Sequence, residues 1–263
     1  MNEKELLNQI SESYYTILGP KLVGIYVHGS IAFGCFNWDK SDIDFLVVIN
    51  DILTLEEKKS LIKQIIDLEF VSPPKGFEMS VILEKYCKNF VYPTPYELHY
   101  SNNYLRQAKS DLDKYCLNMN GVDKDLASHF IVVQKVGFTL YGCDIHNVFS
   151  GEVPKNDFLD SIKIDIENSE NDIKKSIEEN DNQSFIYIVL NLCRVLAFIS
   201  QNLVLSKEQG GKWGIKSLPM NLHSVINAAL ESYQSSNIKW ADQKDIKQFV
   251  HYMITKIFDK KDD

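Results

Sequence analysis

Long apolar runs separated by short polar segments characterise the first third of the chain. Near-continuous runs of valine, isoleucine, leucine and phenylalanine at residues 22–28 and 43–49 predict two strands of a sheet that is covered on at least one face. A third strand is predicted at residues 77–83, where alternation places Glu78 and Ser80 on one face and apolar side chains on the other. These runs predict a small mixed sheet.

Helices are predicted between and around these strands. Residues 5–17 carry apolar side chains at helical spacing. Thr54 and Glu57 have the spacing of a capping box, which predicts a helix that runs to about Leu68. The tyrosines and prolines of residues 84–103 follow no regular spacing, so this segment is predicted to be irregular.

The second half of the chain has helical periodicity. A helix is predicted from Asp125 to Tyr141, ended by Gly142. Further helices, whose apolar stripes are first of all the core of a bundle, are predicted at residues 157–178, 184–202, 219–234 and 240–259. A glycine- and proline-containing segment near residue 150 predicts a domain boundary. The expected fold class is therefore α+β, with the small mixed sheet and its helices in residues 1–150 and a helical bundle in residues 151–263.

Composition narrows the class of protein. The chain has 263 residues and a net charge of −8, which argues against a nucleic-acid surface and suits a cationic small substrate. The five cysteines are widely spaced and form no Cys-x-x-Cys motif, so we expect reduced thiols in a cytoplasmic protein. No run of about eighteen apolar residues occurs, so no membrane span is expected. We expect a monomer.

The most informative chemistry lies between the first two predicted strands. A Gly29-Ser30 turn follows the first strand, and an Asp42-x-Asp44 pair opens the second. Two acids that are two positions apart on a strand point to one face. Because neighbouring strands lie about 4.8 Å apart, Glu78 on the third strand can reach the same pocket. The turn could offer its backbone N–H groups and the Ser30 hydroxyl to phosphate.

Three such carboxylates could hold one or two magnesium ions against a nucleotide triphosphate. Glu78 could also act as general base towards an attacking hydroxyl group. Glu97 is a competing base, but it falls in a predicted loop or short helix, and a strand holds a base more rigidly. The structural alternative is that each motif alone is ordinary, since Asp-x-Asp pairs and Gly-Ser turns are common.

This order of motifs resembles the nucleotidyltransferase superfamily related to DNA polymerase β. The resemblance extends into the helical half, which is similar in order and spacing to the aminoglycoside adenylyltransferases that modify streptomycin and spectinomycin. The segments that carry it are Leu190-Asn191-Leu192-Cys193-Arg194, Ser206-Lys207, Lys212-Trp213, Leu218-Pro219, Glu231-Ser232-Tyr233 and Phe249-Val250-His251-Tyr252. The thirteen-residue separation of Arg194 and Lys207 is more specific than the Asp-x-Asp pair.

The resemblance implies an N-terminal polymerase-β-like nucleotidyltransferase domain, a C-terminal helical domain and an ATP site between them. It implies that Asp42, Asp44 and Glu78 hold magnesium, with Glu78 as the catalytic base. Gly29 belongs to the turn at the phosphates, and Ser30 and Ser41 would contact the triphosphate.

In the helical half, the resemblance implies that Arg194 and Lys207 bind phosphates and that Tyr233 lies near the nucleotide. A triphosphate beside acids needs cations beyond magnesium, and arginine and lysine usually supply them. Without the resemblance, the two bases would be solvated residues on a helix pair, and Tyr233 would be a half-buried core ring.

The chain departs from the family where streptomycin is recognised. Dual-specificity members carry a tryptophan where this chain has Asn103, and an aspartate where it has Ser184. Asp181 lies three residues before Ser184 and could partly replace that acid. Asp125 matches a family Asp-x-Asp-Leu-Ala motif and could face the substrate or cap a helix. These departures favour spectinomycin over streptomycin.

The leading hypothesis is an enzyme that transfers AMP from ATP to a hydroxyl of an aminoglycoside-type antibiotic, releases pyrophosphate and confers resistance. One alternative is a nucleotidyltransferase that acts on another small molecule or on a protein. A second alternative is a nucleotide-sensing or partner-binding module without turnover.

Overall fold

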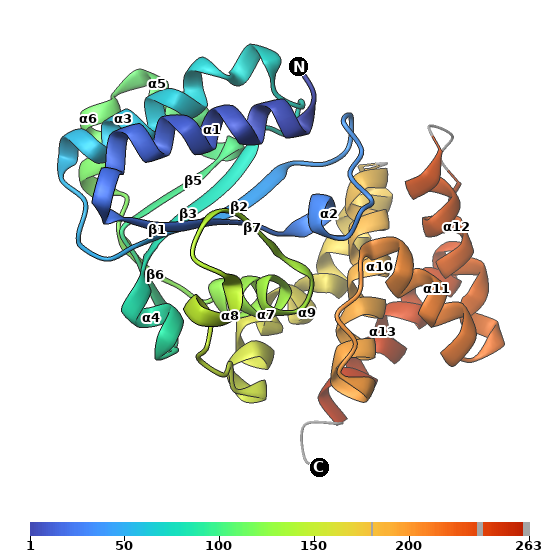
Figure 1. The fold of residues 1–263 in the computed structure, drawn as a ribbon. Helices are drawn as coiled ribbons and strands as arrows, with labels where there is room; N and C mark the ends of the chain where they lie inside the picture. The colour runs from blue at the N-terminus through green and yellow to red at the C-terminus, as the bar shows by residue number, and fades with distance from the viewer. Residues whose placement is uncertain (180, 236–238, 260–263) are drawn as a thin grey trace. The chain divides into compact units, whose positions relative to one another are not determined.

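A five-stranded mixed sheet organises the N-terminal part of the chain (Figure 1). The computed structural model describes residues 1–179, 181–235 and 239–259. In the order β5-β3-β2-β1-β7, the strands are Leu98–Ser101, Phe77–Leu83, Ile43–Ile49, Leu22–Val27 and Phe138–Gly142. β2 and β3 are parallel, and the other neighbours are antiparallel. A separate two-stranded sheet pairs β4 (Thr94–Tyr96) with β6 (Gly121–Asp123).

Helices cover both faces of the five-stranded sheet (Figure 1). One face carries α1 (Glu3–Leu18), α3 (Leu55–Asp67), α5 (Leu105–Ser110) and α6 (Leu112–Asn118). The other carries α4 (Glu84–Lys88), α7 (Leu126–Val136) and α8 (Ile145–Val148). Strand alternation divides the buried residues between the two faces, so that Phe45 packs under α1 and α3 whereas Leu46 packs against α7 and α8. Short α2 (Gly29–Ala32) follows the end of β1.

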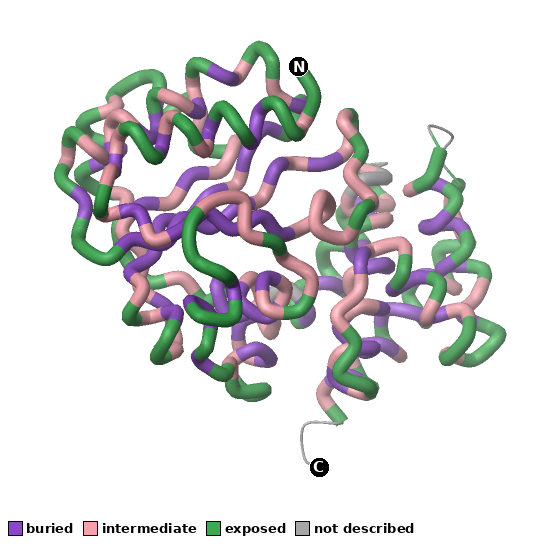
Figure 2. The backbone as a smooth tube through the Cα atoms, viewed as in Figure 1, coloured by how far each residue is buried: buried purple, intermediate pink, exposed green. Residues whose placement is uncertain are grey.

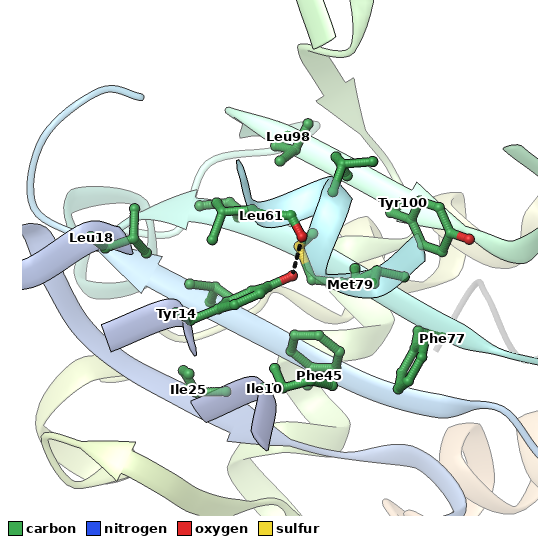
Figure 3. Packing of buried hydrophobic residues seen from close by; sticks show 14 of the residues in the cluster. Ile10, Tyr14, Leu18, Ile25, Phe45, Leu61, Phe77, Met79, Leu98 and Tyr100 are labelled. Atoms are coloured by element: carbon green, nitrogen blue, oxygen red, sulfur yellow. Dashed lines mark hydrogen bonds between the residues drawn. The ribbon is translucent and has the colours of Figure 1, made fainter. Parts of the chain in front are cut away.

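The larger of the two cores lies between the sheet and α1 and α3 (Figure 3). The Tyr14 ring meets Phe45 edge-on, with ring centroids 6.0 Å apart. Its hydroxyl donates to the Leu61 carbonyl oxygen at 3.4 Å, and burial raises the pKa of Tyr14 far above its ordinary value. Figure 2 shows the same division along the chain, with buried residues following the strands and exposed residues on the outer sides of the helices. The sheet that carries the candidate site is therefore rigidly supported.

The chain divides into two compact units, Met1–Ser161 and Ile162–Asp263. The division falls within α9 (Lys155–Glu178), and the domain boundary near residue 150 stays a prediction. The second unit continues with α10 (Asn182–Gln201), α11 (Lys207–Ser217), α12 (His223–Gln234) and α13 (Gln243–Asp259). Turns of 3-10 helix occur at Gly19–Lys21, Glu69–Val71, Asn102–Tyr104 and Met220–Leu222.

Helix α10 is the centre of the second unit and packs against α11, α12 and α13. Its segment Ser184–Gln201 is long and apolar enough to cross a membrane, but 56% of that segment is buried within the unit, as in the core helix of a bundle. Helix α11 approaches α10 and α12 through glycines. A Cβ atom on Gly210 would lie 2.6 Å from Arg194 Cγ, and one on Gly211 would lie 2.6 Å from Leu230 Cδ2.

Most predicted elements are confirmed, including the α+β fold class, the three strands, α1, and α3 with its Thr54–Glu57 capping box. The prediction of an irregular segment at residues 84–103 was wrong, because it contains α4, β4 and β5. Apolar side chains are too few there to show a period, and pairing with β3 and β6 makes these strands.

Two helix predictions also need correction. The helix predicted to reach Tyr141 ends at Val136, and Phe138–Gly142 forms strand β7 against β1. Gly137 ends the helix, and a short apolar run after it has no period that distinguishes helix from strand. Helix α11 was missed because glycines, rather than large apolar side chains, form its packed face.

The packing predicts a large difference between two phenylalanines. Phe45 is fully buried in the larger core, whereas 92% of Phe70 is exposed. Phe45→Ala should lower the free energy of unfolding by about 3–5 kcal/mol, because it removes a ring and leaves a cavity. Phe70→Ala should change it by less than about 0.5 kcal/mol. Urea titration of both variants measures the difference, and equal midpoints would contradict the assignment of the core.

Candidate active site

Three carboxylates meet where β2 and β3 begin. The parallel register pairs Asp44 directly with Glu78, and Asp42 lies just before β2 on the same side as Asp44. One oxygen from each of the three residues lies within 4.8 Å of the other two. All three side chains are half-buried. This set offers hard oxygen donors and stays open to solvent, as a magnesium site that also receives phosphate requires.

The Gly29-Ser30 turn lies directly against this cluster. Gly29 has a φ of +61°, and a Cβ atom on it would come within 1.8 Å of Asp44 Oδ2. The backbone N–H of His28 donates to the Asp44 carbonyl oxygen at 3.1 Å. Only glycine fits here, because both the positive φ and the close approach exclude a side chain. The turn and the acid therefore form one packed unit.

Two serines border the cluster in different states. The Ser30 hydroxyl oxygen is buried and, within the described parts of the chain, has no hydrogen-bond partner. Buried polar atoms are normally paired, so this hydroxyl is available to a bound group. The Ser41 hydroxyl is buried and accepts a hydrogen bond from Asn37 N at 3.2 Å. It still has its hydrogen to donate.

Two histidines, His99 and His129, lie near Glu78, and His28 packs against His129. Sequence reasoning missed all three because they are far apart in the chain. His129 on α7 places Nε2 3.9 Å from Glu78 Oε1. The His28 ring lies against the His129 ring, with centroids 4.9 Å apart. Burial, with His129 nearby, lowers the pKa of His28 well below its ordinary value.

The third histidine, His99, lies on β5 opposite Ser80 of β3. Its Nδ1 lies 2.9 Å from the Ser80 hydroxyl oxygen. Burial lowers the pKa of His99, although the nearby Glu78 and Asp123 carboxylates oppose this shift. The one feature of the sequence that bears on His99 is the strand alternation, which places its partner Ser80 on the same face as Glu78.

Glu97 lies away from the cluster. It joins β4 to β5, its N–H donates to the Val81 carbonyl oxygen, and its Oε2 accepts a hydrogen bond from Leu53 N at 3.4 Å. Val81 is three residues beyond Glu78 on β3, which is roughly 10 Å along a strand. The competing base therefore belongs to the opposite end of the strands.

Two further predicted residues, Asn103 and Asp125, are exposed in the N-terminal unit. Asn103 is exposed on the turn after β5, whose residue Ser101 pairs with Glu78. Asp125 is exposed at the N-cap position of α7, but its side chain makes no capping hydrogen bond. Instead, Asp125 N donates to Asp123 Oδ1 at 2.9 Å.

In the helical unit, the predicted bases lie on α10 and α11. The Arg194 guanidinium donates to Asn191 Oδ1 at 2.6 Å, and Lys207 Nζ lies 5.2 Å from the centre of the Tyr187 ring. Tyr187, Asn191 and Arg194 recur at helical spacing and share a face of α10. Tyr233 is half-buried on α12.

The same face of α10 borders an acidic pocket of about 420 Å³ within the helical unit. Its charged lining consists of Asp172, Lys175, Glu179 and Asp181, and Ser184, Tyr187 and Asn191 also border it. The Asp181 carboxylate accepts hydrogen bonds from Ser184 N at 3.3 Å and from Ser184 Oγ at 2.5 Å. Asp181 and Ser184 are thus joined by hydrogen bonds.

The chain is similar in sequence and fold to known proteins. Residues 147–256 match the family model of the aminoglycoside adenylyltransferase C-terminal domain. A spectinomycin 9-adenylyltransferase from Enterococcus faecalis is 21% identical over 96% of this chain and 95% of its own length. The chain is thus similar to aminoglycoside adenylyltransferases along most of its length.

Other relatives match over similar lengths. A spectinomycin 9-adenylyltransferase from Staphylococcus aureus is 25% identical over 90% of this chain and 88% of its own. An aminoglycoside (3'') (9) adenylyltransferase from Shigella flexneri is 24% identical over 97% of both chains. The crystal structure of an Enterococcus spectinomycin adenyltransferase with ATP and spectinomycin has the same fold, with a TM-score of 0.76, 21% identity and coverage of 98% of this chain and 100% of its own.

The contact between Gly29 and Asp44 predicts a specific loss of cation binding. Gly29→Ala should weaken Mn²⁺ binding at least about tenfold, because a methyl group would displace the Asp44 carboxylate from the site. Gly34→Ala is the matched control, since Gly34 has a φ of +68° but no atom within 4 Å of a new Cβ. The control should lose about 1–2 kcal/mol of stability from backbone strain alone. Equal Mn²⁺ affinities in the two variants, measured by electron paramagnetic resonance, would contradict this role of Gly29.

Proposed function

We propose that this protein transfers AMP from ATP to a hydroxyl group of an aminocyclitol antibiotic, prefers spectinomycin to streptomycin and so confers resistance. The observation that carries the proposal is the convergence of Asp42, Asp44 and Glu78 beside the glycine turn. The names of the family members support the reaction and the acceptor class. We infer that the protein acts in the cytoplasm as a monomer on small molecules.

The donor set fits magnesium. Asp42, Asp44 and Glu78 would hold one or two ions through carboxylate oxygens, and their partial exposure leaves positions for phosphate and water. Bound there, magnesium would offset negative charge on the α-phosphate and on the departing pyrophosphate. The unpaired Ser30 hydroxyl would donate to an outer phosphate oxygen, and Ser41 would donate from the loop before Asp42.

Glu78 would carry out the proton transfer. Its carboxylate would take the proton from the acceptor hydroxyl as that oxygen forms a bond to the α-phosphorus. The bond from the α-phosphorus to the bridging oxygen then breaks, and pyrophosphate leaves with its electron pair. Arg194 and Lys207 would bind triphosphate oxygens, and Tyr233 would pack near the nucleotide.

The acidic pocket of the helical unit supports a cationic acceptor. Asp172, Glu179 and Asp181 outnumber the single lysine of the pocket, so an amine-bearing ring would be attracted to it. The Asp181–Ser184 pair offers a carboxylate and a hydroxyl at the position where the family recognises streptomycin with an acid. Exposed Asn103 gives that drug no aromatic surface, and Asp125 would face either drug from the start of α7.

A nucleotidyltransferase with another small-molecule or protein acceptor is the second candidate. Asn103 and Ser184 favour it, as does an identity of only 21–25% to the named relatives. A module that only binds nucleotide is disfavoured, because three clustered carboxylates repel one another and contribute nothing to such binding without a cation.

Incubation with Mg²⁺-ATP tests the acceptor. Spectinomycin should gain the mass of one AMP with release of one pyrophosphate. Streptomycin should react at least about tenfold more slowly, because the missing aromatic contact at Asn103 should cost roughly 1.4 kcal/mol or more. Mass spectrometry and a pyrophosphate assay measure both. Pyrophosphate release with neither drug modified would remove the antibiotic and leave the second candidate.

The base assignment is tested with a matched pair of substitutions. Glu78→Gln should lower kcat by about 10²–10⁴-fold, because the amide cannot accept the proton, while an ATP complex still forms. Glu97→Gln should keep nearly full activity, since Glu97 lies at the far end of the strands. Full turnover by Glu78→Gln would exclude Glu78 as the base.

A further inference from the structure

Two histidines connect the phosphate turn with the proposed base. His28 lies between β1, which ends at Val27, and Gly29, and only 4% of it is exposed. Its ring meets the His129 ring with centroids 4.9 Å apart and an interplanar angle of 43°. The position of His129 is thus defined by a buried ring from the turn.

Helix α7 defines the same position from the other side. Leu126, Phe130 and Val133 bury that helix in the core below the sheet, so His129 projects from a rigid element. Its Nε2 lies 3.9 Å from Glu78 Oε1, with side-chain exposures of 22% for His129 and 33% for Glu78. Within the described residues, no other basic side chain lies within ion-pair distance of that carboxylate.

Glu78 needs such a partner. Its side chain has several rotatable bonds and lies close to two aspartates of the same charge, which push it away from the cluster. His99 does not provide the contact, because among the described residues His129 is the histidine whose ring nitrogen lies within ion-pair distance of the Glu78 carboxylate.

We propose that His129 is a positioning residue for Glu78: its Nε2–H, held by the His28 ring, keeps the Glu78 carboxylate turned towards the two aspartates. At 3.9 Å, the contact between His129 Nε2 and Glu78 Oε1 is longer than a hydrogen bond. Contacts between catalytic groups are often long before ligands bind and shorten in the substrate complex. The inference rests on the proposed function, since it assigns Glu78 the roles of base and cation ligand. His129 itself does not touch the reacting atoms.

Three substitutions of His129 distinguish the effect of its N–H donor from the effect of its ring. His129→Phe keeps the ring beside His28 but removes the N–H, so kcat should fall by about 10–100-fold, the loss of one hydrogen bond to a charged group, with KM for ATP within about threefold. His129→Gln carries an amide N–H at a similar reach and should recover most of the loss. His129→Asn is one methylene shorter, cannot reach Glu78 and should resemble the Phe variant; it replaces that variant if phenylalanine does not fold.

Mn²⁺ binding in the presence of a non-hydrolysable ATP analogue gives a readout independent of turnover. His129→Phe should weaken Mn²⁺ binding about three- to tenfold in the wild-type background and have no effect in a Glu78→Gln background, because the contact acts through Glu78. Equal effects in both backgrounds, or no effect on kcat and Mn²⁺ affinity, would overturn the positioning role. If Glu78→Gln alone keeps full turnover, Glu78 is not the base and the inference fails with that assignment, whereas the proposed transfer of AMP would still stand.

Discussion

The parallel pairing of β2 with β3 is the constraint on which the rest of this structure depends. Its register aligns Asp44 with Glu78, and alternation adds Asp42 on the same side. A shift of one residue in β2 or β3 would turn the acidic side chain of that strand towards the opposite face of the sheet. Phe45, Phe77 and other apolar side chains form the core on that face. The hydrophobic burial of the alternate residues therefore holds the carboxylates together.

That arrangement is unfavourable by itself. Two like charges at roughly 4 Å repel by about 1 kcal/mol in bulk water and by about 4 kcal/mol near a protein surface. The two-sided core of the sheet provides the stability that tolerates this repulsion, and a divalent cation would relieve it. Gly29 packs directly against Asp44. Burial lowers the pKa of His28, which disfavours a positive charge on this buried ring.

In the helical unit, polar side chains gather on one face of the central helix α10. That helix is apolar on most sides, yet one face carries Tyr187, Asn191 and Arg194 beside an acidic pocket. The glycines of α11 allow that helix to lie close to Arg194, and its Ser206–Gln209 capping box starts it at Lys207. The acidic side chains of the pocket and the basic side chains of Arg194 and Lys207 thus lie on adjoining elements of one small bundle.

The sequence by itself determined the three central strands, the capped helix α3, the bundle stripes and the choice of Asp42, Asp44 and Glu78, because each depends on local spacing along the chain. It could not determine β5 and β7, which are short and become strands only by pairing with β3 and β1. It could not identify α11, whose packed face consists of glycines.

Tertiary structure also decided the positions of the three histidines, and it placed Glu97 away from the carboxylate cluster. His28, His99 and His129 are separated by many residues, and only the sheet and α7 bring His99 and His129 near Glu78 and His28 against His129. Local patterns record which residues share a face, whereas contacts between distant segments depend on register and packing, and no spacing within one segment encodes these.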